Sequence, residues 1–169
     1  KKILDYNPEK PVKIQTMDPK EIKRNKDIEH IKEFLQCMQI EIIDNHIKNI
    51  PNYIDDNIWF FYHRLESIAH SSRFNLYNKE LYAFMVDYWT SLNETLNYSE
   101  CYNPTSNGSR YTWHNPGDMP LSEEKQRKWD NIKNARGNLN YSLRNILEII
   151  REDYLEIDID KISELNYKE

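Results

Sequence analysis

The sequence predicts an all-α protein, and three observations carry that expectation. Its 169 residues include only 3 Gly and 7 Pro, too few turn residues for a sandwich or barrel of many short strands. Apolar side chains recur every three or four residues, which is the spacing of a helix with one buried face. Helix start signals precede these stretches. We therefore expect one domain, an up-down-up-down four-helix bundle with long first and last helices.

The domain is expected to begin at residue 18. Pro8 and Pro11 interrupt any helical period in residues 1–17, so this segment is expected to be an extended lead-in. Asp18 is a suitable N-cap and Pro19 a suitable first helical residue, with a glutamate in the first turn to complete a capping box. The bundle is then expected to span residues 18–156, followed by an acidic tail at residues 157–169.

The first helix is expected to be a single rod of about thirty residues that ends before Pro51. Its apolar positions step by three and four residues, as in a bundle seam. They are Ile28, Ile31, Leu35, Met38 and Ile42. His46 lies one turn beyond the last of these on the same seam. We interpret it as a hydrogen-bonded core histidine rather than a ligand.

The second helix, expected from residue 52 or 54 to residue 72, carries two stripes. The first is the core face, made of Ile58, Phe61, Tyr62, Leu65, Ile68 and Ala69. The second stripe lies about 100–160° away on the helical wheel. It consists of Trp59, His63, Glu66 and His70, with Phe60 also pointing outward. Either another helix or a binding partner is needed to cover these aromatic side chains.

The second half of the chain is expected to hold two further helices around one irregular segment. Asn78 is a suitable N-cap for a third helix that ends near residue 99. Residues 102–120 are rich in Pro, Gly and Asn, so a long loop is expected there. A long fourth helix should begin at Ser122 and continue to about residue 155. Gly137 lies in its middle, where it indicates a close helix crossing or a kink.

The composition restricts the classes of partner. The formal net charge is −5 and no basic stripe is visible, so we expect no nucleic acid to bind. No stretch approaches the length of a membrane span. Residues 1–26 carry eight Lys and Arg against four Asp and Glu, as do segments just inside a membrane. The chain begins with Lys1 rather than Met. We therefore expect a cytoplasmic protein whose membrane contact, where it has one, is made by a segment outside this chain.

Two alternatives assign chemistry to the second helix. His63, Glu66 and His70 place imidazole and carboxylate groups on one helical face, the donor set of a metal site. No second motif matches it elsewhere in the chain. Arg64 and His70 resemble the Arg-x(4–6)-His motif of HEPN-like ribonucleases. That resemblance implies that Arg64 holds a phosphate and that His70 acts as the general base.

A broader resemblance covers the second and third helices. Residues 65–69, Leu-Glu-Ser-Ile-Ala, are followed by Leu76, by Glu-Leu at 80–81 and by Tyr-Trp at 88–89. This pattern is similar to a family of uncharacterised bacterial proteins in which a transmembrane helix precedes a small helical domain of unknown function. The resemblance implies a helical hairpin rather than a catalytic centre.

Taken together, the residues favour a non-catalytic interaction or regulatory module. We expect no cofactor and no metal. The expected partner is a protein, either another chain or a second copy of this one. Six residues from the second stripe and from the long loop form the predicted binding surface. They are Trp59, Phe60, His63, His70, Tyr111 and Trp113.

Overall fold

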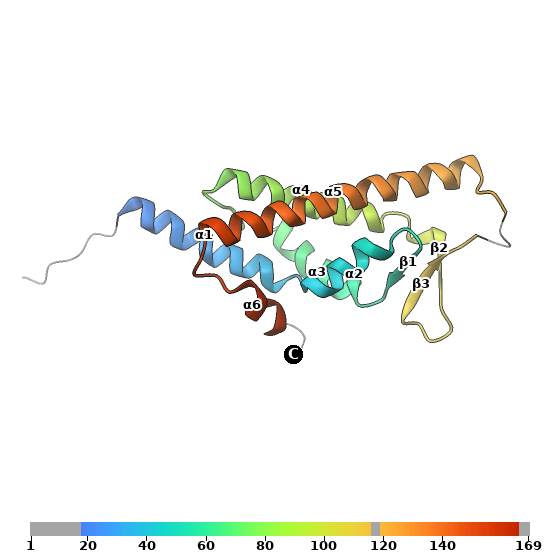
Figure 1. Cartoon of the computed structure of the whole chain (residues 1–169), viewed down its shortest axis with the longest axis horizontal. Coiled ribbons are helices and arrows are strands. Elements are labelled where there is room, and N and C mark those ends of the chain that lie inside the picture. Colours follow the sequence, from blue (N-terminus) through green and yellow to red (C-terminus); the bar gives the residue numbers. More distant parts are fainter. Residues whose placement is uncertain (1–17, 116–118, 166–169) are drawn as a thin grey trace, which may run out of the picture.

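The computed structural model describes residues 18–115 and 119–165 (Figure 1). The expected lead-in at residues 1–17 and the end of the expected tail, residues 166–169, lie outside the described residues. In this part of the chain, six α-helices, one short 3-10 helix and one small sheet make up the secondary structure. The prediction of a mostly helical protein is therefore confirmed.

The prediction of one long first helix is wrong, because this segment forms two helices. Asp18 caps the start of α1 (Pro19–Gln36), as expected. The chain then turns, and α2 (Ile40–Asn49) begins at a new cap, where the side-chain oxygen of Gln39 accepts a hydrogen bond from the Ile42 N–H at 3.0 Å. A glutamine cap is outside the usual set of N-cap residues. The apolar seam continues across the break and conceals it in the sequence.

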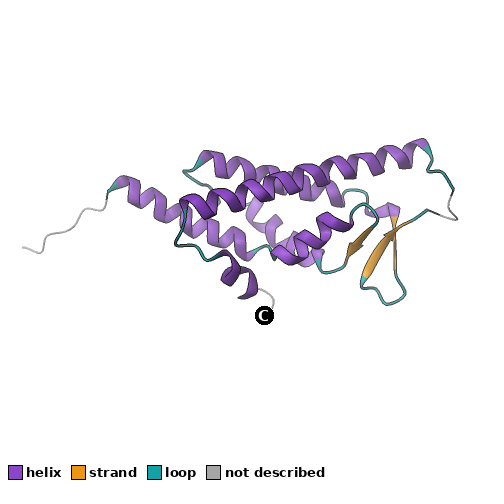
Figure 2. Ribbon diagram, viewed as in Figure 1, coloured by secondary structure: helices purple, strands orange, loops and turns teal. Residues whose placement is uncertain are grey.

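The expected loop at residues 102–120 and the expected start of the second helix are both corrected by a sheet (Figure 2). The strands are β1 (Tyr53–Asp55), β2 (Tyr102–Pro104) and β3 (Arg110–Trp113). They are antiparallel in the order β1-β3-β2. A short 3-10 helix, η1 (Ser99–Cys101), leads into β2. Strands of three or four residues are too short to show a period of two in the sequence.

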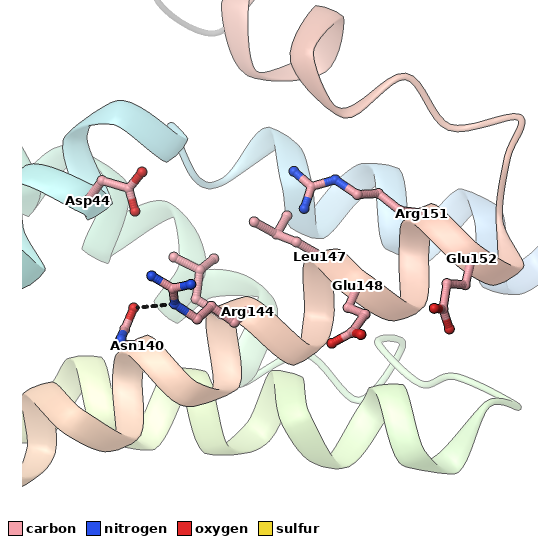
Figure 3. A pocket seen from close by; sticks show the side chains of 8 residues that line it. Asp44, Asn140, Arg144, Leu147, Glu148, Arg151 and Glu152 are labelled. Carbon is pink, nitrogen blue, oxygen red and sulfur yellow. Dashed lines mark hydrogen bonds between the residues drawn. The ribbon is translucent and has the colours of Figure 1, made fainter.

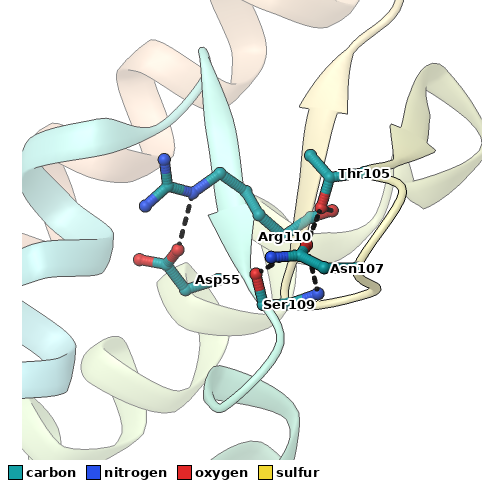
Figure 4. A network of polar contacts seen from close by, with 5 residues as sticks. All are labelled: Asp55, Thr105, Asn107, Ser109 and Arg110. Atoms are coloured by element: carbon teal, nitrogen blue, oxygen red, sulfur yellow. Dashed lines mark hydrogen bonds and ion pairs between the residues drawn. The ribbon is translucent and has the colours of Figure 1, made fainter.

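The turn between β2 and β3 is held by side chains (Figure 4). The Asn107 side-chain oxygen accepts hydrogen bonds from the N–H and the hydroxyl of Ser109, at 3.2 and 2.9 Å. Gly108 takes the left-handed conformation, with φ of 69°, which favours glycine. Beyond the turn, Nε of Arg110 donates to Oδ1 of Asp55 at 2.9 Å and so ties β3 to β1.

The remaining helices form the body of the molecule. α4 (Lys79–Leu96) lies antiparallel along α5 (Glu123–Asp153), and α3 (Ile58–Ala69) packs against α4 (Figure 1). The expected acidic tail contains a helix of its own, α6 (Ile159–Leu165), which packs against α1. Within the described residues, no helix is both long enough and apolar enough to cross a membrane.

One end of the helical body is joined by a buried carboxylate. Asp27 of α1 is 3% exposed. Its two oxygens accept hydrogen bonds from the backbone N–H groups of Tyr77 and Asn78, at 2.6 and 2.8 Å. The Tyr154 hydroxyl, just after α5, donates to the same carboxylate at 3.4 Å. We call this set of four residues the Asp27 junction. It fastens α1 to the α3–α4 turn and to the end of α5.

The other end of the body is closed by aromatic rings. The Trp113 ring of β3 packs edge-on against Tyr102 of β2 and against Trp129 of α5, with both pairs of ring centroids 5.2 Å apart. The Tyr102 hydroxyl donates to the Pro51 carbonyl at 2.9 Å. We call Pro51, Tyr102, Trp113 and Trp129 the sheet end. These contacts attach the three strands to the helices.

Gly137 does not mark a close crossing. It is exposed within an uninterrupted α5, and a Cβ added there would meet nothing within 4 Å. The neighbouring Arg136, which interrupts the apolar pattern of the helix, has a different role. Its guanidinium donates to the Ile50 carbonyl at the end of α2, at 3.1 Å. The expectation of a crossing or a kink at Gly137 is therefore wrong.

Candidate functional site

The two stripes predicted for the second helix are present on α3. Ile58, Phe61, Leu65 and Ile68 are buried in the core. Ala69, which was expected on the same core face, is exposed at the end of α3, so that part of the prediction is wrong. Trp59 and Glu66 of the second stripe are half-buried, whereas His63 and His70 are exposed. The second stripe therefore meets solvent along most of its length.

Four rings of α3 and α4 form a row across this surface. The Tyr62 ring stacks on Trp89 of α4 with centroids 5.2 Å apart, and Trp59 meets Tyr62 edge-on at 5.8 Å. His70, directly after α3, also meets Trp89 edge-on, with centroids 6.1 Å apart. The Tyr62 hydroxyl donates to the Asn93 side chain at 2.8 Å. We call Trp59, Tyr62, Trp89 and His70 the aromatic row.

The row includes two residues that the binding prediction omitted. Tyr62 falls on the expected core face but is only half-buried, and burial followed by the nearby Glu66 carboxylate raises the pKa of its hydroxyl. Trp89 lies one helical turn after the buried Met85. Its position next to the core face of α4 was a usable signal for a half-exposed ring.

The row has a hollow at each end. The hollow beside Trp89 has a volume of about 260 Å³. It is lined by aliphatic and aromatic residues, among them Phe34, Leu65, Ile68, Phe74, Tyr82 and Met85. The hollow beside Trp59 has a volume of about 230 Å³ and lies where α3 meets the sheet. Half-exposed aromatic rings between small apolar hollows are typical of protein-binding surfaces.

The structure brings together some of the predicted binding residues. Trp59 and Tyr111 line the same hollow. His70 is exposed at one end of the row, and His63 is exposed beside it. Tyr111 and Trp113 are two residues apart in β3, a spacing that places both side chains on the same face of the sheet. Trp113 nevertheless packs into the sheet end, where its ring contacts Trp129. Its role is packing.

Phe60 does not join the others. Its side chain is 56% exposed, and the Arg64 guanidinium lies over its ring at 5.5 Å from the centroid. Phe60 follows Trp59 by one residue, which places the two about 100° apart around α3. The predicted surface is thus divided between two sides of one helix.

The residues of the ribonuclease alternative lie in different surroundings. Arg64 lies over Phe60 and beside the buried thiol of Cys37, whose pKa burial raises to about 11. His70 follows the last residue of α3 and contacts Trp89 on the α4 side. The two side chains thus contact different neighbours.

The three residues of the metal alternative are not assembled either. His63 and Glu66 form an i, i+3 pair with Nδ1 and Oε2 3.4 Å apart. In residues 18–115 and 119–165, no three His, Cys, Asp or Glu side chains are grouped closely enough to hold a metal ion. His63 and Glu66 can be understood as an ordinary surface pair of one helix.

The buried titratable groups have structural roles. Nε2 of His46 lies 2.9 Å from the Thr95 hydroxyl, as expected for a core histidine, and burial lowers its pKa to about 3. The thiols of Cys37 and Cys101 are both buried and free. Burial also raises the pKa of the Cys101 thiol. Protonated buried thiols are poor nucleophiles.

A charged groove lies along the second half of α5, and the sequence did not predict it. Its volume is about 500 Å³, with Asp44 of α2 on one wall. The guanidinium groups of Arg144 and Arg151 point to the side of α1 and α2, and the carboxylates of Glu148 and Glu152 to the α4 side (Figure 3). Since two positive and three negative groups share this groove, its charge favours neither an anion nor a cation.

Comparisons with known proteins add no relative. The chain matches no protein-family model, no curated protein and no solved structure. The resemblance of residues 65–89 to a family of anchored bacterial proteins therefore stays a prediction. Function must be argued from the described surface itself.

Proposed function

We propose that this protein is a non-catalytic interaction module that binds a protein partner through the aromatic row. α1 with α2, α3, α4 and α5 would serve as the four arms of an up-down-up-down bundle that holds the row rigid. We place the protein in the cytoplasm, with any membrane contact made by a segment outside this chain. The observation that carries the proposal is the row itself, half-exposed between two apolar hollows.

The chemistry of the row suits protein recognition. Trp and Tyr are enriched among the residues that dominate binding energy at interfaces, because they bury a large area at a small cost in side-chain entropy. Trp59, Tyr62 and Trp89 already restrict one another through ring contacts. A partner that covers them would therefore lose little further freedom in this chain.

Site-specific photocrosslinking tests the proposal. His63 lies beside the row with a side chain that is 67% exposed, so it can be replaced by benzoylphenylalanine without disturbing the core. Lys133, exposed on α5, is the matched control position. After irradiation of cells that make the protein, we expect one saturable adduct from position 63 and none from position 133.

The identity of the adduct decides between two partners. An adduct of twice the mass of the chain identifies a second copy, and any other mass identifies a different protein. In both cases we expect the adduct to disappear when Trp59→Ala and His70→Ala are combined in a chain that keeps its helical circular dichroism. An adduct that persists in this double variant, or that forms equally at Lys133, would contradict the proposal.

A further inference from the structure

The hollow beside Trp59 is lined by three aromatic rings from three separate segments. Trp59 comes from the first turn of α3, Tyr102 from β2 and Tyr111 from β3. Ile54, Ser99 and Pro104 complete the lining, which therefore contains no Lys or Arg. A ring of aromatic side chains around a small volume, here about 230 Å³, is the arrangement that binds quaternary ammonium groups.

The three rings are held in place before any ligand binds. Tyr111 is paired with Ile54 in the sheet, and its hydroxyl donates to Oδ1 of Asp56 at 3.3 Å. The Tyr102 hydroxyl is bonded to the Pro51 carbonyl. The Trp59 ring packs edge-on against Tyr62, with centroids 5.8 Å apart. Ligand binding would thus require little ordering of the site.

The charge at the rim favours a cation. The Asp56 carboxylate is exposed and bonded to Tyr111, and it forms no ion pair within the described residues. The nearest arginine along β3, Arg110, is already engaged by Asp55 and by the Tyr53 ring, 3.8 Å from its guanidinium carbon. The Asp56 carboxylate, bonded to one of the three lining rings, therefore places negative charge next to the hollow.

We propose that this hollow binds a methylated ammonium group on a lysine side chain of a protein partner. The inference rests on the proposed function and names the chemistry that one end of the aromatic row recognises. An unmethylated ammonium is strongly hydrated and carries three donors, whereas Ser99 supplies the only hydroxyl of the lining that is not on a ring. Methylation removes those donors and keeps the charge.

The same chemistry occurs in a choline headgroup, and the lining argues against that source. The phosphate of phosphocholine is attached to the choline, so it would lie close to the Asp56 carboxylate. Among the residues that line the hollow, none is a Lys or Arg that could neutralise a phosphate. A lysine side chain brings no such anion.

A titration of the whole chain with three peptides tests the proposal. The peptides are seven residues long and identical except for the central residue. This residue is trimethyllysine, lysine, or an uncharged analogue with a tert-butyl carbon in place of the trimethylammonium nitrogen. Binding is followed by the NMR signal of the Trp59 indole N–H. We expect the trimethyllysine peptide to bind about tenfold more tightly than either of the others.

Single variants locate the site. We expect Trp59→Ala and Tyr111→Ala each to weaken binding of the trimethyllysine peptide at least about tenfold. Binding to Tyr111→Ala is read through the Trp59 indole signal, and binding to Trp59→Ala, which lacks that indole, through the methyl signal of the peptide. Asp56→Asn should weaken binding of the trimethyllysine peptide and leave binding of the uncharged analogue unchanged. Tyr141→Ala, which removes an exposed ring of α5, is the matched control and should change neither.

Each contrary result overturns the proposal in a defined way. Equal binding of the uncharged analogue would show an apolar pocket without cation recognition. Tighter binding of phosphocholine than of choline would assign the site to a headgroup. No shift of the Trp59 signal with any peptide would exclude the site. If that happens while the crosslink at position 63 remains, the inference alone fails; loss of the crosslink as well removes the proposed function.

Discussion

At one end of the molecule a buried carboxylate joins three segments, whereas at the other end aromatic rings pack between a small sheet and the helices. The Asp27 junction works through directional hydrogen bonds, and both oxygens of its carboxylate accept from groups of this chain. Next to the sheet end, Trp59 and Tyr111 stay half-exposed and line one hollow together with Tyr102. Both ends hold helices together, but only the second leaves a surface for another molecule.

The difference follows from the chemistry of the two kinds of contact. A buried carboxylate must accept hydrogen bonds from donors of the protein itself. The Asp27 carboxylate is therefore occupied by its own chain and offers no surface to another molecule. An aromatic ring has two faces and an edge, and packing one of them leaves another available. The following substitutions challenge this comparison, from the largest expected effect to the smallest.

Removing the carboxylate should have the largest effect. We expect Asp27→Ala to lower the free energy of unfolding by about 3 kcal/mol, because two backbone N–H groups and one hydroxyl lose their buried acceptor. Glu29→Ala, exposed on the same helix, is the control and should change stability by less than about 0.5 kcal/mol. Urea denaturation measures both. A loss below about 1 kcal/mol at Asp27 would show that the junction is not a main fastening.

The sheet end should depend on Trp113 for stability but not for binding. We expect Trp113→Ala to lower the free energy of unfolding by about 2 kcal/mol, less than for a fully buried ring because Trp113 is half-buried. Tyr111→Ala, two residues earlier, should cost less than half as much. Thermal and urea denaturation of the two variants provide the comparison. If Tyr111→Ala were the more costly change, Tyr111 would be a packing residue and not part of an open site.

A buried imidazole near the sheet end should make stability depend on pH. Burial holds the pKa of His46 at about 3 in the folded protein, whereas the unfolded chain titrates near 6.5. Between about pH 6.5 and pH 3, His46 is therefore protonated in the unfolded chain and neutral in the folded protein. The stabilising contribution of His46 is complete above about pH 6.5 and is lost below it, by up to about 1.4 kcal/mol per pH unit.

Urea denaturation at a series of pH values, from about 7 to about 5, checks this dependence against His46→Gln. The glutamine cannot titrate, so the stability advantage of the wild type over this variant should shrink as the pH falls. His63→Gln, in which the lost imidazole was exposed, is the control and should keep the wild-type slope. A His46→Gln variant with an unchanged slope would show that the buried imidazole is not the titrating group.

Two glycines should respond in opposite directions to the same substitution. Gly137→Ala, in the exposed middle of α5, should raise the free energy of unfolding by about 1 kcal/mol because alanine favours the helix and meets no neighbour. Gly108→Ala, in the β2–β3 turn with φ of 69°, should lower it by about 1 kcal/mol. Thermal denaturation measures both. A destabilised Gly137→Ala variant would revive a special role for that position in α5.

The candidate site was only partly accessible to sequence reasoning. The wheel of residues 54–72 separated the buried face from the stripe that holds Trp59 and His70, and both stripes are present on α3. The same wheel could not show that Trp89 stacks on Tyr62, nor that Phe60 turns away from the row. Helical spacing reports which side of one helix a residue occupies, but not which neighbour covers that side.

The sequence by itself determined the local features of this protein. The caps at Asp18, Asn78 and Ser122 and the core faces of the helices follow from contacts within four residues. Only the tertiary structure decided that β1 pairs with β3, which lies 55 or more residues away, or that Asp27 receives donors from residues 77 and 78. Such contacts leave no periodic pattern, because their partners meet through folding of the whole chain.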